Sequence, residues 1–312
     1  MRRDFPVYAI PTDTVRRILA EKNFLKKIVY RPASGTALNF HAQENSTTIN
    51  HAAKQLANNP ETSVSALSNS EQAQAYEMAY DYLYYQFLAH EVDKTTTPPK
   101  LRNLLIKRSA YPAAERSSPP KPLIDPAQGH DTSRFMLGAG YQQHEGFVSI
   151  DYRPAYHDLL DNDDGYRRGA AIDFLRFQLR YQTESEQLKL QRFTFVSIDS
   201  LAPRNDFQKP LSWSLAMGSQ QVAVNSQGLF SSQEQHGVAF VEGGAGISSK
   251  LNTDNWLCYG FLQGHLQGGS HLDEGWRVGV GSKLGCRQQS RFGQILIDVQ
   301  SIYHQDSQAF LS

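Results

Sequence analysis

The sequence has little of what several protein classes require. It has only two cysteines, Cys258 and Cys286, and they form no C-x-x-C pair, which excludes zinc-ribbon and thioredoxin-like sites. No run approaches the roughly 18 apolar residues that a membrane-spanning helix needs. Basic and acidic residues number 31 each, so no net charge attracts nucleic acid. We therefore expect neither a nucleic-acid partner nor a helical membrane anchor.

A secretory signal peptide is also missing from this sequence. Arg2 and Arg3 supply basic charge at the N-terminus, but no apolar core follows them. Taken literally, this feature would place the chain in the cytoplasm. The inference fails if the chain is a fragment of a longer, exported protein.

The two cysteines lie in segments that resemble strands, and nothing in their spacing indicates that they pair. A disulfide would form only if the fold brought them together. We expect free buried thiols, with the disulfide as the alternative.

Residues 1–110 carry the apolar period of helices. Ser68 and Glu71 fit a capping box, and an apolar stripe then recurs every three or four positions. Its members are Ala73, Tyr76, Tyr80, Leu83 and Phe87. The many tyrosines there are typical of a helix between core and water, and the alternative is an aromatic binding surface. Three more helices are expected: one capped by Thr12 or Asp13 and ending at Leu19, one over 47–57 and one over 101–107.

Residues 111–128 contain five prolines, which remove amide donors and fix φ. Neither a helix nor a central strand is compatible with this composition. We interpret the segment as a linker between a helical segment, residues 1–110, and a second domain, residues 129–312.

After Gly129 the apolar period changes from 3.6 to 2. Leu175, Phe177 and Leu179 share one face, for example, while Arg176 and Gln178 share the other. Similar alternation recurs in the segments 211–217, 276–284 and 295–299, and further strands are expected to start near Phe135, Phe147, Phe193, Val238 and Trp256. The pattern predicts an antiparallel β-domain of about nine strands with one apolar and one polar face.

Two architectures fit this pattern. A soluble sandwich or barrel turns its apolar face inward, whereas a membrane barrel turns it outward toward lipid. Strands of about ten residues, glycines on the second face and aromatic residues near strand ends favour the membrane barrel. The predicted fold class is therefore α+β: a helical segment followed by an antiparallel β-barrel of the outer-membrane type.

Motifs for known chemistry are weak. The glycine-rich segments 243–246 and 279–285 lack the spacing of phosphate loops, and strand packing explains them more simply. Ser133, His130 and Asp131 supply the residue types of a catalytic triad but no G-x-S-x-G elbow. His130 and His157, with Asp151 and Asp158, could also be metal ligands, but without the spacing of a known site. We predict no catalytic residue, no metal and no cofactor.

One polar segment remains as a candidate functional loop. The stretch 151–161 is rich in polar and aromatic residues and precedes an Asn-Asp-Asp-Gly turn. It is either a structural corner held by hydrogen bonds, which we favour, or a loop that lines a pocket. The candidate residues are His130, Ser133, Arg134, Asp151, Arg153, Tyr156, His157 and Asp158.

Several stretches resemble one family: the segments 5–15, 29–34, 129–134, 152–160, 200–203 and 210–213. They are similar to Lnb-like proteins, which are bacterial envelope proteins related to a lipoprotein N-acyltransferase. The most specific stretch is R-P-A-Y-H-D-L-L, residues 153–160. The resemblance covers about residues 5 to 300 and implies a location in the cell envelope, in the outer membrane or the periplasm.

The resemblance also implies a papain-like catalytic domain that precedes this region. The family's nucleophile lies in an Asn-Cys pair and its histidine in a Phe-Gly-His run. This sequence has neither, because Cys258 follows Leu257 and Cys286 follows Gly285. No catalytic residue is carried over, since acyl transfer needs a thiolate and a positioned imidazole. The expected partner is therefore the missing catalytic domain, or another chain that supplies it.

We therefore predict a non-catalytic barrel and helical adaptor that anchors or positions a cysteine acyltransferase-like domain, with membrane lipid as a further partner. The C-terminal residues 309–312 lack the terminal aromatic typical of outer-membrane barrels, which indicates a barrel that is truncated there. Two alternatives stay open. One is a soluble periplasmic module that holds a lipid or glycan, and the other is an enzyme that uses the region of His130 and His157.

Overall fold

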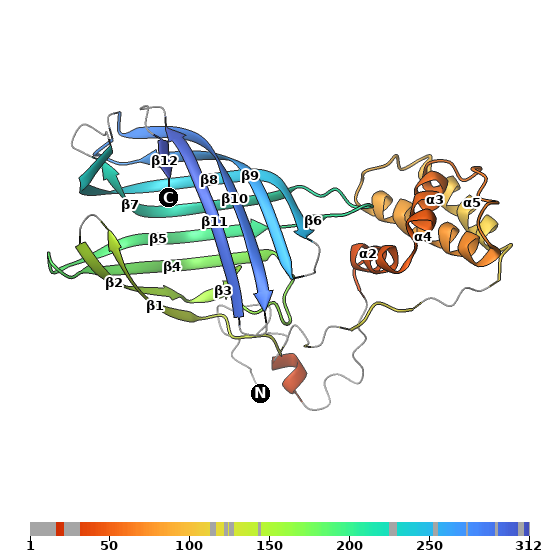
Figure 1. Ribbon diagram of the computed structural model, residues 1–312, viewed down its shortest axis with the longest axis horizontal. Helices are drawn as coiled ribbons and strands as arrows, with labels where there is room; N and C mark the ends of the chain where they lie inside the picture. Colours follow the sequence, from red (N-terminus) through yellow and green to blue (C-terminus); the bar gives the residue numbers. More distant parts are fainter. Residues whose placement is uncertain are drawn as a thin grey trace, which may run out of the picture. The chain divides into compact units, whose positions relative to one another are not determined.

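The computed structural model describes residues 17–21, 32–112, 117–121, 124, 128–142, 145–224, 230–251, 255–272, 274–290, 293–304 and 309–311. These residues form two compact units, which we describe separately (Figure 1). The helical unit spans residues 17–122 and also includes Asn205–Lys209. The β unit comprises residues 123–204 and 210–312. The predicted cap at Thr12 or Asp13 lies outside the described residues.

In the described residues of the helical unit, the long helices are α2 Ser34–Glu44, α3 Thr47–Asn58, α4 Asn69–Leu88 and α5 Thr97–Arg108. The capping box of α4 is confirmed, because Ser68 Oγ accepts from the Glu71 amide and the Glu71 carboxylate accepts from the Ser68 amide at 2.9 Å. α3 and α5 confirm two predicted helices, although α5 begins four residues earlier than expected. The sequence reasoning missed α2.

The core of the helical unit is apolar and includes one residue from a distant segment. Leu56, Met78 and Leu104 are fully buried on α3, α4 and α5, and Phe207 packs into the same cluster. The tyrosines of α4 behave as predicted for a helix between core and water. Tyr76 is buried in the core, whereas Tyr84 is exposed. No helix among the described residues is long and apolar enough to cross a membrane, and this finding concerns helices alone.

The β unit is one sheet whose neighbouring strands run antiparallel, apart from the short parallel pair β6–β8. Nine long strands confirm the predicted number: β1 Arg134–Gln142, β2 Glu145–Arg153, β4 Ala170–Gln182, β5 Gln187–Ser200, β7 Ser212–Val224, β8 Phe230–Leu251, β9 Trp256–Gly268, β10 Trp276–Ser290 and β11 Gly293–His304. Three short strands complete it: β3 Ala155–His157, β6 Pro203–Arg204 and β12 Ala309–Leu311. In the described part of the chain, β1 and β12 end the ladder and do not pair with each other. The sheet is thus an antiparallel half-barrel, where we predicted an antiparallel barrel that is truncated near its C-terminus.

The two faces of the half-barrel differ sharply in polarity. On β9, the side chains of Gln263, His265 and Gln267 are buried, while the alternating residues Leu262 and Leu266 are exposed. Inward side chains of distant strands meet, since Gln300 on β11 and Arg192 on β5 both contact Glu242 on β8. The interior face is therefore largely polar, apart from a small apolar cluster that includes Leu257, Tyr259 and Phe261, and the exterior face is apolar.

Glycines in β8 and β10 serve close strand packing, as we predicted in place of a phosphate loop. A Cβ at Gly246 would lie 1.9 Å from the carbonyl oxygen of Gly260 on the neighbouring strand. A Cβ at Gly281 would lie 2.0 Å from the carbonyl oxygen of Ser301. Any larger residue at these positions would push neighbouring strands apart.

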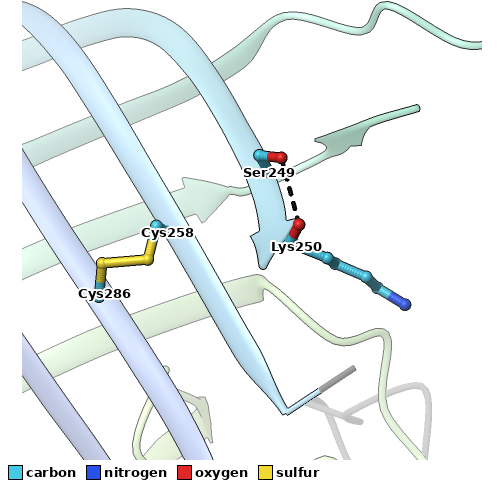
Figure 2. Close-up of a disulfide and its surroundings, with 4 residues drawn as sticks. All are labelled: Ser249, Lys250, Cys258 and Cys286. Carbon is cyan, nitrogen blue, oxygen red and sulfur yellow. Dashed lines mark hydrogen bonds between the residues drawn. A yellow bond between two sulfur atoms is a disulfide. The ribbon is translucent and has the colours of Figure 1, made fainter. Parts of the chain in front are cut away.

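The prediction that the two cysteines are free thiols is wrong. Cys258 and Cys286 form a disulfide between β9 and β10 rather than remaining free thiols (Figure 2). The two residues lie directly opposite each other in the β9–β10 register, with their Cα atoms 4.0 Å apart. Strand register is set by pairing across the sheet, so the spacing in the sequence did not reveal this proximity.

Candidate functional site

The candidate loop forms a corner at the end of the half-barrel where β1 begins and β2 ends. Arg153 is the last residue of β2, Pro154 interrupts the ladder, and the short strand β3 then pairs with β4. Asp158 closes the corner, because its carboxylate accepts from the Leu160 amide and its own amide donates to Asp161 Oδ2, both at 2.8 Å. These hydrogen bonds agree with the favoured prediction of a structural corner, while Asp151 of the same segment lines a cavity, as the alternative prediction expects.

A network of buried charges surrounds this corner. Arg134 binds Asp158 and, at 2.7 Å, Asp161. Arg153 is only 1% exposed and lies 2.6 Å from Asp161. Arg176 contacts Asp151 at 2.9 Å and Asp173 at 3.0 Å. Buried ions are costly to desolvate unless they are paired. Removing one member of this network would therefore leave a buried charge without its partner and destabilise the fold.

Strands from the other side of the sheet also hold the corner. Arg287 on β10 is 0% exposed, and its guanidinium lies 2.8 Å from the Asp163 carboxylate and donates to the Asp161 carbonyl oxygen. Gln294 on β11 donates to the same carbonyl. Leu159 packs into a small apolar cluster with residues of β9. The segment 158–163 therefore fills this end of the half-barrel interior, and we name it the corner plug.

Two histidines stack beside the plug. His130 Nε2 lies 2.8 Å from His157 Nδ1, and the Tyr166 ring stacks on both imidazoles. Burial lowers the pKa of His157 to about 4, against the opposing charge of Asp161. The imidazole is therefore neutral near pH 7. Burial also acts to raise the pKa of Asp161, but hydrogen bonds from Arg153 and from the Asp158 amide outweigh it, and the pKa is lowered.

A polar cavity of about 310 Å³ lies on the interior face next to the network. Charges of both signs line it, among them Asp151, Asp173 and Arg176 of the network. Arg192 and Glu242 form a further ion pair at 3.2 Å in its wall. The cavity suits water or a strongly polar solute better than a lipid chain.

The structure brings together most of the predicted site residues. Arg134, Asp151, Arg153 and Asp158 belong to the charge network, and His130 contacts His157. Tyr156 is half-buried, with a left-handed φ of 76°, and its backbone pairs with β4.

The triad suggested by residue type does not form. Ser133 is exposed just before β1. The His130 ring contacts the backbone carbonyl of Asp131 at 2.6 Å. Asp151 pairs with Arg176 rather than with a histidine.

The sequence analysis did not identify six charged members of the network as site residues: Asp161, Asp163, Arg168, Asp173, Arg176 and Arg287. The available signal was the charged residues that alternate with apolar ones along β4 and β10. Those charges were interpreted as a polar strand face, and not as partners of the loop.

The fold and site define a class: an antiparallel half-barrel with a polar interior and a charged corner plug, joined to a helical unit. The family model described as Domain of unknown function (DUF7840) matches residues 123–311, more than half of the chain, and the chain belongs to this family. A second model, Domain of unknown function (DUF7842), matches residues 28–120. No match was found among the curated proteins or the solved structures.

Proposed function

We propose that this chain is the membrane-embedded barrel and helical adaptor of an Lnb-like bacterial envelope protein, and that it anchors a cysteine acyltransferase-like domain. The observation that carries the proposal is the exposed apolar exterior face. Leu137 is 81% exposed and Leu262 is 79% exposed, each in the middle of its strand. Contiguous apolar surface of this extent is rare on soluble monomers and marks a membrane or protein interface.

Exposed apolar side chains occur on all nine long strands. Representative residues are Leu137, Val148, Leu175, Leu190, Trp213, Val241, Leu262, Val280 and Ile297. In a soluble lipid-holding barrel the apolar face would line the cavity instead. The described residues have the opposite arrangement, which favours the membrane form over that alternative.

Aromatic residues flank the apolar band at both ends of the strands. Phe135 and Trp213 lie at the end that carries the corner plug. Tyr141, Trp276 and Tyr303 lie at the opposite end, and all five are at least 40% exposed. Two such girdles, at the two membrane–water interfaces, are typical of transmembrane barrels.

The interior face supports the same proposal. Its basic and acidic side chains pair with one another, as at Arg192–Glu242 and Lys283–Asp298. Transmembrane barrels alternate lipid-facing apolar residues with polar residues that face inward. The Cys258–Cys286 disulfide adds independent support, because disulfides persist in oxidising compartments such as the bacterial periplasm.

The acyltransferase part of the proposal rests on the resemblance of the segments 129–134 and 152–160 to Lnb-like proteins. Within this chain those segments build the charge network rather than a nucleophile and base. A rigid corner of this kind suits a scaffold better than a catalytic centre.

Liposome flotation tests membrane insertion. We expect the refolded chain to float with phosphatidylcholine vesicles and to resist extraction at alkaline pH. Leu262→Asp should weaken this association, whereas the neighbouring interior substitution Gln263→Glu should leave it largely intact. A chain that remains soluble and monodisperse without detergent, and does not float, would refute the proposal.

A further inference from the structure

Three potential metal ligands converge beside the corner plug. His130, His157 and Asp161 each offer one donor atom, and these atoms all lie within 4.8 Å of one another. His130 Nε2 is 2.8 Å from His157 Nδ1, which is 3.7 Å from Asp161 Oδ2. His157 and Asp161 are buried, and His130 is half-buried. The donors come from three segments: His130 precedes β1, His157 ends β3, and Asp161 lies in the corner plug.

The hydrogen bonds of His130 orient it as a ligand. Its Nδ1 lies 2.6 Å from the Asp131 carbonyl oxygen, and a carbonyl only accepts, so Nδ1 carries the proton. In the neutral ring, Nε2 therefore presents its lone pair toward His157 and Asp161. Histidine ligands of metals commonly donate their other ring N–H to a backbone carbonyl in this way.

Tyr166 further fixes the site. Its ring stacks on His130 at 4.4 Å and on His157 at 4.5 Å between centroids, and its hydroxyl donates to the His130 carbonyl oxygen at 3.0 Å. Both imidazoles are thus held in place before any ion arrives. Such preorganisation is what a metal site needs from its surroundings.

We propose that His130, His157 and Asp161 bind one divalent transition-metal ion of the zinc class. The ion takes the place of the proton that His157 Nδ1 now shares with His130 Nε2, and that proton moves to Nε2 of His157, which keeps the ring neutral. Zn–N bonds of about 2.0–2.1 Å in a tetrahedron place two nitrogens about 3.3 Å apart, so small ring rotations suffice. Three protein ligands leave the fourth position for water.

The surrounding charges are compatible with this ion. Arg134 binds the other oxygen of Asp161 at 2.7 Å and keeps the carboxylate oriented. Arg153 lies 2.6 Å from Asp161 Oδ2, but it also lies 3.4 Å from Asp158 and 3.5 Å from Asp173. When Asp161 Oδ2 coordinates the ion, the Arg153 guanidinium can pair with these two aspartates instead.

The sequence reasoning predicted no metal because it looked for ligands at the spacings of known motifs. His130 and His157 are separated by all of β1 and β2, and Asp161 was not among the candidates. This inference does not depend on membrane insertion, since the ligands lie outside the nine long strands.

Cobalt substitution tests the site. The full chain is stripped of metal with a chelator and titrated with Co²⁺, and the visible absorption and the stoichiometry are measured. We expect one ion per chain, the intense bands of tetrahedral cobalt, and displacement of cobalt by Zn²⁺. His130→Ala and His157→Ala should each weaken binding by more than the roughly 10–100-fold that losing an outer-shell partner costs.

Two histidine variants serve as matched controls. His51 is exposed on α3, and His271 is exposed and stacks on His236 in a separate cluster. His51→Ala and His271→Ala should bind cobalt as the unmodified chain does, and circular dichroism should show that all variants fold. The proposal is overturned if no stoichiometric binding occurs. It is equally overturned if binding survives in His130→Ala and His157→Ala, or is lost in His271→Ala.

Discussion

Replacing Arg287 by methionine tests whether the corner plug is held by buried charge pairs. The Arg287 side chain is fully buried, and its guanidinium pairs with Asp163 at 2.8 Å and donates to the Asp161 carbonyl. Methionine keeps much of the volume but removes the closer of the two arginines that Asp163 contacts in the described residues, leaving Arg168 at 3.7 Å. Breaking a buried pair on one side costs about 3–5 kcal/mol. We expect Arg287→Met to lower the free energy of unfolding by that amount.

The measurement is reversible urea unfolding, followed by circular dichroism. The double variant Arg287→Met/Asp163→Asn is the control, because it removes both charges together. It should recover about 0.5–3 kcal/mol, the range of coupling energies between residues in contact. If Arg287→Met costs less than about 1 kcal/mol, or if the double variant shows no coupling, the plug is not held by this pair.

Three further predictions concern the helical unit, strand packing and the disulfide. Hydrogen bonds from the Ser68 amide and hydroxyl lower the pKa of Glu71, so the unfolded state takes up protons first as the pH falls. Stability should therefore fall as the pH drops below about 4.5, and Glu71→Gln should remove this part of the pH dependence in urea unfolding. Gly246→Ala should cost about 1–3 kcal/mol by overpacking, whereas Gly264→Ala, with open space around its Cβ, should cost far less in the same assay. A thiol assay of the denatured, unreduced chain should detect no free thiol, and Cys258→Ser should lower the free energy of unfolding by about 2–4 kcal/mol; two free thiols would contradict the disulfide.

Local signals predicted most of the secondary structure. The capping box at Ser68 and Glu71 uses contacts three residues apart, and such contacts are visible in sequence. The period-2 alternation along β4 and β10 is likewise local. α2 was missed because it has no side-chain cap, no acidic residue in its first turn, and only two buried residues, Leu38 and His41.

Features that depend on pairing across the sheet could not be predicted. The disulfide requires the β9–β10 register, and the charge network requires Arg287 on β10 to reach the segment after β3. The curvature of the sheet brings those residues together, and no spacing in the sequence encodes it. The sequence identified the segments 129–134 and 152–160 as candidates for a functional loop. Their charged partners on β4 and β10 could be assigned only from the three-dimensional structure.

Strand β1 forms one edge of the sheet in the described residues. In hydrocarbon every backbone polar group must be paired, and the described residues pair β1 on one side only. We therefore expect the edge of β1 to pair with a further strand when the chain is inserted. Amide hydrogen exchange of β1 in vesicles, compared with a water-soluble preparation, should reveal this added protection.

The most direct test of the central claim is the depth of the exterior face in a bilayer. Trp213, Trp256 and Trp276 are the three tryptophans of the chain, and all can be changed to phenylalanine. In that background, Leu262→Trp probes the exterior face at mid-strand, and Gln263→Trp probes the interior face one residue away. Vesicles whose lipids carry bromine deep in the acyl chains should strongly quench Leu262→Trp and leave Gln263→Trp nearly unquenched. Equal and weak quenching of both would show that the apolar face does not contact lipid.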